Sequence, residues 1–239
     1  MRIGFRFRAI PFVATVLLVA LGVSLGQWQD RRADGKIALQ DKLAARASAA
    51  AVIVGPQALA REQVEYHKVS VAGQFVANFP LFLDNRPLGG KTGYYLVMPF
   101  KVAGSDMHVL VARGWLPRQA GDHELRPEIS TPAGTVIVSG VAKGSLARVM
   151  QLGDPAAVKP NALLQNVDPV GFGAATGMKV QPFFIEQTAP AGPGDELVRD
   201  WPAPALGVDK HRGYAFQWYA LALMAFLFFV ITGFRREPN

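Results

Sequence analysis

The chain has 239 residues, a net charge of +7 and no cysteine, and half of its residues are hydrophobic. The length allows one domain with its own core beside the terminal segments. The lack of cysteine excludes disulfides, thiolate metal sites and thiol nucleophiles. Five terminal arginines and one glutamate contribute +4 of the charge: Arg2, Arg6, Arg8, Arg235, Arg236 and Glu237. No basic stripe remains in the middle, so we expect no nucleic-acid partner.

The hydrophobic residues gather near the two ends of the chain. Residues 10–26 read IPFVATVLLVALGVSLG without a charge, and as a helix they span roughly 25 Å, just enough for a bilayer core. Residues 214–234 contain one amide, Gln217, and are long enough to cross. We predict membrane helices at 10–27 and 214–234. A cleaved signal peptide is the alternative for the first, because small residues at Ser24 and Gly26 follow the apolar run.

The terminal arginines predict the topology. Basic residues outside both spans place the tails, 1–9 and 235–239, in the cytoplasm by the positive-inside rule, and the long middle on the opposite side of the bilayer. Aromatic residues of the belt type mark the outer ends of both helices: Trp28, Tyr214, Trp218 and Tyr219.

The middle of the chain predicts a helical connector, a β-rich domain and a linker. Residues 28–65 form the connector, since 31–51 is rich in Ala with charges at helical spacing. Residues 66–190 carry short strand patterns at 66–76, 81–84, 94–102, 107–112, 136–141 and 183–187. We predict an antiparallel sheet or barrel with a hairpin loop at 104–106 and a short helix between Asp168 and Gly177. The stretch 191–213 is a linker with prolines.

No familiar catalytic pattern is present. Gly89-Gly90-Lys91-Thr92 is similar to a phosphate-binding loop, but Asn85 stands where that pattern needs glycine, and two tyrosines follow where a helix is required. No two of the histidines have zinc spacing: His67, His108, His123 and His211. We therefore expect that the protein is not an enzyme.

One histidine stands at the edge of the second membrane helix. His211 precedes Tyr214 by three residues and Trp218 by seven, so the three share a helix face. A neutral imidazole there can ligate haem iron while aromatics pack the macrocycle and arginines, Arg212 among them, bind propionates. The alternative is a histidine of the interfacial belt. The predicted cofactor-binding residues are His211, Tyr214, Trp218, Trp28, Arg31 and Arg32, with His211 as the metal ligand.

Several short motifs in order resemble one known family. They are Leu25 to Gln29 with Arg31, Arg32 and Lys36; Gly73 and Phe75; Asn85-Arg86; Gly93-Tyr94; Pro99; Val111; Arg113 to Pro117; Pro182 to Glu186; and His211, Tyr214-Ala215 and Gln217 to Tyr219. The chain resembles the Surfeit locus family of cytochrome oxidase assembly factors. It departs at Ala112, where relatives often carry Asn, and at Asp209-Lys210.

The resemblance implies an uncleaved protein of the bacterial inner membrane with a periplasmic middle domain. It implies aid in delivering haem A, bound transiently, to the catalytic subunit of a haem-copper oxidase; haem A synthase and the lipid bilayer are further expected partners. A scaffold that stabilises the nascent oxidase subunit without haem stays open, and a membrane-tethered enzyme is less favoured. In Arg113-Gly114-Trp115 we expect a close approach at Gly, core packing by Trp and a surface pair for Arg, with partner binding as the alternative.

Overall fold

The computed structural model describes residues 3–5, 7–118, 127, 129–151, 153–189, 195–201 and 207–236. The chain divides into two compact units: Ala44–Pro202, and Met1–Leu43 together with Ala203–Asn239. The first unit contains β2 Val52–Ile53, α2 Arg61–Val64, β3 Lys68–Phe75, β4 Leu81–Leu83, β5 Gly93–Val102, β6 Met107–Pro117, β7 Val136–Lys143, β8 Leu163–Leu164, α3 Pro169–Thr176 and β9 Lys179–Gln187. His123, one of the four histidines considered for zinc spacing, lies outside the described residues.

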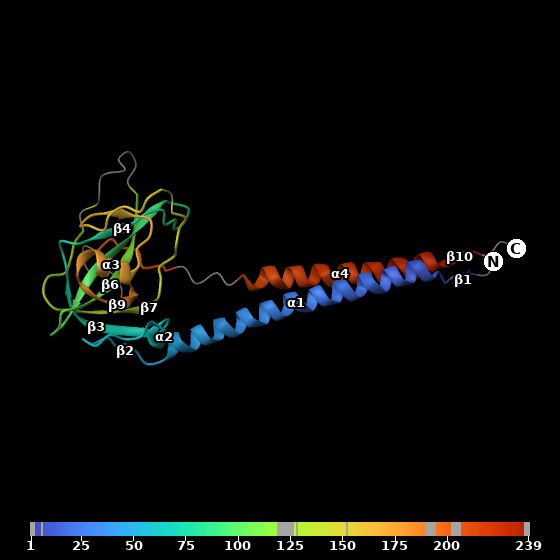
Figure 1. The fold of residues 1–239 in the computed structure, drawn as a ribbon, viewed down its shortest axis with the longest axis horizontal. Coiled ribbons are helices and arrows are strands. Elements are labelled where there is room, and N and C mark those ends of the chain that lie inside the picture. The colour runs from blue at the N-terminus through green and yellow to red at the C-terminus, as the bar shows by residue number, and fades with distance from the viewer. Residues whose placement is uncertain are drawn as a thin grey trace. The chain divides into compact units, whose positions relative to one another are not determined.

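The β-rich unit is a closed barrel with two short extensions (Figure 1). Its strands follow the order β2-β3-β7-β9-β6-β5-β4-β8, and β3 also pairs with β5, so β3, β7, β9, β6 and β5 form a ring. This confirms the predicted β-rich fold. The neighbours β6 and β9 are parallel, which differs from a purely antiparallel sheet. The reason is that β7 and α3 lie between them in the chain and return it to the end at which β6 begins.

Glycine permits the closure of the ring. A Cβ on Gly73 would lie 2.0 Å from the carbonyl oxygen of Lys101 on β5, so any side chain there would push the two strands apart. The ring encloses a core of aromatic and branched residues, among them Phe100, Val111 and Phe183. The neighbouring Phe184 faces a second cluster that α3 covers with Phe172. Because side chains alternate between the two faces of β9, this strand contributes residues to both cores.

Two local predictions are confirmed by the backbone. Asp168 Oδ1 accepts hydrogen bonds from the amides of Val170 and Gly171, both at 3.0 Å, and caps α3. Gly177 ends that helix in the left-handed conformation, with φ 73°. The loop between β5 and β6 falls at residues 103–106, as the hairpin prediction required.

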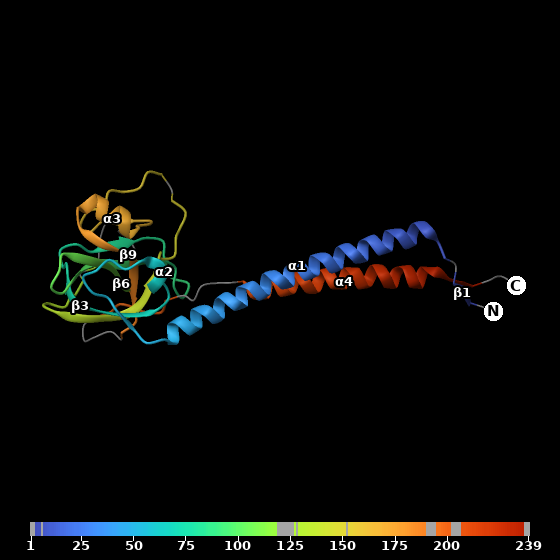
Figure 2. The same ribbon diagram turned by 60° about the horizontal axis from the view of Figure 1, so that its bottom comes forward.

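The second unit is a pair of antiparallel helices, which lie side by side in Figures 1 and 2. They are α1 Ala9–Ser48 and α4 Val208–Gly233, and both are long and apolar enough to span a membrane. The short strands β1 Ile3–Phe5 and β10 Phe234–Arg236 pair beyond them. A Cβ on Gly22 would lie 2.9 Å from Ala222 Cβ, and one on Gly26 would lie 2.5 Å from the Tyr219 ring. Two glycines four residues apart thus let the helix backbones approach closely.

Part of the predicted linker belongs to the barrel unit. Residues 195–201, here called the strap, pair with β6 through Val198, whose carbonyl accepts from the Trp115 amide at 2.7 Å and whose amide donates back at 2.9 Å. Trp201 donates to the carbonyl of Gln187 at 2.8 Å and packs on the Tyr95 ring. Apolar residues inside a proline-rich stretch explain the docking. Residues 191–194 and 202–206 of that linker lie outside the described residues.

Candidate functional site

The candidate site lies where α4 begins, against α1. His211 Nδ1 is 2.7 Å from Gln29 Oε1. An amide oxygen can only accept, so Nδ1 carries the proton and the lone pair of Nε2 is left for a ligand. Metal-binding histidines typically donate their other ring N–H to such an acceptor, which fixes the ring and its tautomer. The arrangement therefore fits an axial ligand of a haem iron.

The described residues contain no cluster of three or more His, Asp or Glu side chains arranged to hold a metal ion. A haem brings four nitrogens of its own and needs an axial ligand from the protein. A single histidine with a free Nε2 therefore suits a haem better than it suits a bare metal ion.

Cations gather on the same face of α1 as Gln29. Arg32 and Lys36 follow Gln29 by three and seven residues, which is the helical repeat, and both charges act on the His211 imidazole. Arg31 follows by two residues and faces elsewhere; its charge acts on Tyr219, whose hydroxyl donates to Asp30 Oδ2 at 2.8 Å. Of the two predicted propionate ligands on α1, Arg32 thus shares the helix face of Gln29, and Arg31 does not.

Two residues of this site were not predicted from the sequence. Gln29 and Lys36 both belong to motifs that carry the family resemblance, but neither was predicted to act at the site. The available signal was their seven-residue separation, which puts them on one helix face. What the sequence did not supply was the register of α4 against α1, which decides that this face meets His211.

The aromatic candidates differ in exposure. Trp218 is partly buried between the helices, whereas Tyr214 is 53% exposed and Trp28 is 44% exposed. The Arg32 guanidinium lies 5.4 Å from the centre of the Trp28 ring. Arg212 is exposed. The half-exposed Tyr214 ring, one turn after His211 on α4, offers apolar surface on which a macrocycle could pack.

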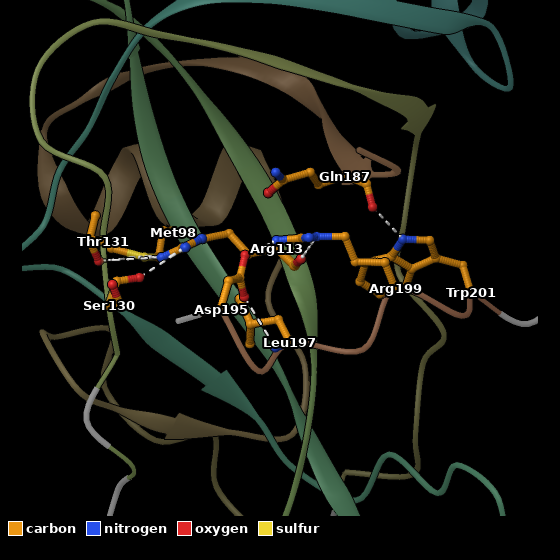
Figure 3. Close-up of polar contacts among 9 residues, drawn as sticks. All are labelled: Met98, Arg113, Ser130, Thr131, Gln187, Asp195, Leu197, Arg199 and Trp201. Atoms are coloured by element: carbon orange, nitrogen blue, oxygen red, sulfur yellow. Dashed lines mark hydrogen bonds and ion pairs between the residues drawn. The ribbon is translucent and has the colours of Figure 1, made fainter. Parts of the chain in front are cut away.

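A second polar cluster surrounds Arg113 on β6 (Figure 3). The predicted surface pair is wrong, because Arg113 is only 2% exposed. Its guanidinium donates to the Ser130 carbonyl at 3.0 Å and to the Thr131 hydroxyl at 3.3 Å, and it covers the Phe75 ring at 4.8 Å. Burial lowers the pKa of Arg113, and the nearby Asp195 opposes that shift.

The Arg113-Gly114-Trp115 motif holds the strap. Arg199 pairs with Asp195 and donates through Nε to the Arg113 carbonyl at 2.8 Å. A Cβ on Gly114 would lie 2.7 Å from Leu197 Cβ, so the strap fits only against glycine, which confirms the expected close approach. Figure 3 shows Asp195 between the two arginine side chains. The cluster is a structural clamp between β6 and the chain that leads to α4.

The glutamate of the Pro182 to Glu186 motif also has a structural partner. Glu186 on β9 lies 3.5 Å from Lys143 Nζ on the neighbouring strand β7. Burial raises the pKa of the Glu186 carboxyl, and the lysine partly offsets that rise. Lys143 in turn lies 4.9 Å from the centre of the Tyr66 ring. The carboxylate therefore joins two barrel strands.

These features define a membrane protein in which a small β-barrel is flanked by two terminal helices. The family model of the SURF1 family matches residues 16–223, and the chain therefore belongs to the SURF1 family, known as a family of cytochrome oxidase assembly factors. This confirms the resemblance found in the motifs.

Individual relatives agree with the family assignment. A SURF1-like protein of Rickettsia felis is 41% identical over 98 residues, which is 39% of this chain and 40% of that protein. One from Rickettsia prowazekii is 26% identical over 96% of this chain and 91% of its own length. The Surfeit locus protein 1 of Mus musculus is 24% identical over 90% and 73%. The match to Rickettsia felis thus spans about two fifths of that relative, while the other two extend over most of both chains.

Proposed function

We propose that this protein is an assembly factor for a haem-copper terminal oxidase that holds haem A at His211 and passes it to the catalytic subunit, without catalytic turnover of its own. The observation that carries the proposal is the 2.7 Å contact between His211 Nδ1 and Gln29 Oε1, which leaves Nε2 free. Membership in a family of oxidase assembly factors supplies the biological setting.

Each residue of the site has a physical task in this proposal. A bound haem would supply an iron that accepts an axial nitrogen, and His211 offers one. Gln29 keeps the imidazole from rotating. Arg32 and Lys36 place positive charge where propionates would lie. Close packing at Gly22 and Gly26 fixes α4 against α1 and so limits movement of His211.

The proposed setting is the bacterial inner membrane, with both tails in the cytoplasm, the N-terminal helix retained and the barrel in the periplasm. The terminal arginines support this orientation. Alkaline phosphatase fused after Ala189 should be active, and intact mass should show the N-terminal helix present. An inactive fusion would reverse the orientation, and a chain beginning near Gln27 would show cleavage.

A scaffold that binds the nascent oxidase subunit without haem is the second candidate, and one surface favours it. Ile53 on β2 is 81% exposed and Ile137 on β7 is 71% exposed. Both strands flank β3, where Ile53 is level with Ser70 and Ile137 with Ala72. With Ser70 and Ala72 between them they form an apolar stretch on the outer face of the barrel, next to Lys68, and such a stretch suits a protein contact.

The absorbance spectrum of the detergent-purified protein, produced together with haem A synthesis, tests the proposal. The wild type should carry a haem band, and His211→Ala should lose most of it at equal protein in the membrane. His67→Ala, in the barrel unit, is the matched control and should keep the band. Equal haem in the wild type and His211→Ala would reject ligation by His211. Absence of haem from all three proteins would favour the scaffold.

A further inference from the structure

An apolar groove runs along the helix pair. It has a volume of about 650 Å³ and is lined by Leu18, Leu21, Gly22, Trp218, Leu221, Met224, Ala225, Leu227, Phe228 and Ile231. On α4 it extends from Trp218 to Ile231, roughly 20 Å of helix. Both helices are long and apolar enough to span a membrane, so the groove lies at hydrocarbon depth.

The groove begins near the candidate site. Trp218 lines the end of the groove nearer to His211 along α4. It follows His211 by two turns, about 10.5 Å along the helix axis, on the same face of α4. The intervening turns present Tyr214, whose ring is 53% exposed. A chain attached to a haem that His211 ligates would therefore start within two helical turns of the groove.

The lining indicates what kind of occupant fits. Transmembrane helices associate through small residues that let backbones approach. Here the small lining residues are Gly22 and Ala225, and Gly22 is already packed against Ala222 of this chain. The remaining eight side chains are large and differ in shape, so the wall is uneven. Such a wall suits a flexible branched hydrocarbon chain better than a third helix.

We propose that this groove takes the isoprenoid tail of a haem whose iron is ligated by His211, so that the protein selects isoprenylated haems over haem B. The inference rests on the proposed function and deepens it. The ring site supplies ligation and charge pairing, which every haem shares. The groove supplies the discrimination, because only an isoprenylated haem has a chain to place there.

Binding of haem O and haem B to the full chain in lipid nanodiscs tests the selection, because these two haems differ by the isoprenoid tail. The isoprenoid tail enters the groove from lipid rather than from water. The free energy of binding therefore gains only from closer packing of the tail. We therefore expect a preference of about tenfold for haem O, equivalent to ~1.4 kcal/mol. Ala225→Phe places a ring in the middle of the groove and obstructs it, so the variant should reduce that preference to near unity while haem B binding stays unchanged.

Ala220→Phe is the matched control, since Ala220 is on α4 but does not line the groove; it should keep the preference. Equal affinities of the wild type for both haems would overturn the groove assignment and leave haem holding intact. An unchanged preference for haem O in Ala225→Phe would also overturn the groove assignment. An equal loss of affinity for both haems in that variant would do the same. If Ala225→Phe keeps the preference but loses the oxidase subunit in co-purification, the groove belongs to a partner helix. Failure of the wild type to bind either haem would overturn the proposed function together with this inference.

Discussion

His211 and Gln29 lie 182 positions apart in the chain, and their side chains meet across α1 and α4 at 2.7 Å. The amide oxygen sets the tautomer of the imidazole and aims its free nitrogen. The axial-ligand position of the site is therefore built by two residues, of which only His211 can ligate the iron.

Gln29→Ala should lower haem retention about 10- to 100-fold, because loss of an outer partner of a ligating histidine has effects of that size. Gln29→Glu keeps an acceptor and strengthens the hydrogen bond, so haem should stay and its reduction potential should fall. Haem per protein and a redox titration measure both. Gln217→Ala, an exposed amide on α4, serves as control. Full retention in Gln29→Ala would contradict the positioning role.

Lys36→Gln should weaken binding of free-acid haem several-fold, whereas Arg31→Gln should change it little, because Lys36 shares the face of Gln29 and Arg31 does not. A dimethyl ester of the same haem lacks the propionate charges, so the Lys36 variant should bind it as the wild type does. Affinities in nanodiscs at fixed ionic strength give the comparison. A larger loss from Arg31→Gln than from Lys36→Gln would show that the propionates lie elsewhere.

Gly26→Ala should loosen the helix pair, because the new methyl would meet the Tyr219 ring at 2.5 Å and displace its hydroxyl from Asp30. Gly35→Ala is the control on the same helix: its Cβ meets nothing within 4 Å, and alanine should stabilise the helix by up to ~1 kcal/mol. The free energy of unfolding in mixed micelles should be lower than that of the wild type for Gly26→Ala and higher for Gly35→Ala. Similar unfolding midpoints for both would argue against close packing at Gly26.

Glu186→Gln tests the pH dependence of the barrel. The folded-state pKa of Glu186 is raised, so its contribution to stability is complete below the unfolded pKa of about 4.3 and is lost as pH rises through the folded value. Glutamine does not titrate. Relative to the wild type, the variant should therefore gain stability as the pH rises from about 4.3 through the folded-state pKa of Glu186, whatever constant difference in packing the amide introduces.

Thermal unfolding of both full-length proteins across this pH range measures the difference. The sign of the change with pH is the decisive feature, because the attraction between Glu186 and Lys143 already enters the folded-state pKa of Glu186. If the variant loses stability relative to the wild type as pH rises, the pKa of Glu186 is lowered in the fold and attraction to Lys143 outweighs burial.

The sequence by itself determined much of the fold. Two uncharged runs near the ends require an apolar solvent, period-two alternation requires half-buried strands, and the Asp168 and Gly177 pair sets both ends of α3. These are local patterns, and local physics decides them. The motifs were also enough to show the family before any contact was known.

Only the tertiary structure decided the contacts between distant segments. The parallel β6 and β9 pair, the strap on Gly114 and the burial of Arg113 depend on which strands become neighbours. At the site, Gln29 and Lys36 gained a role from the register of α1 against α4, which Gly22 and Gly26 fix by close approach. Register is a property of two packed surfaces together, so neither segment alone carries it.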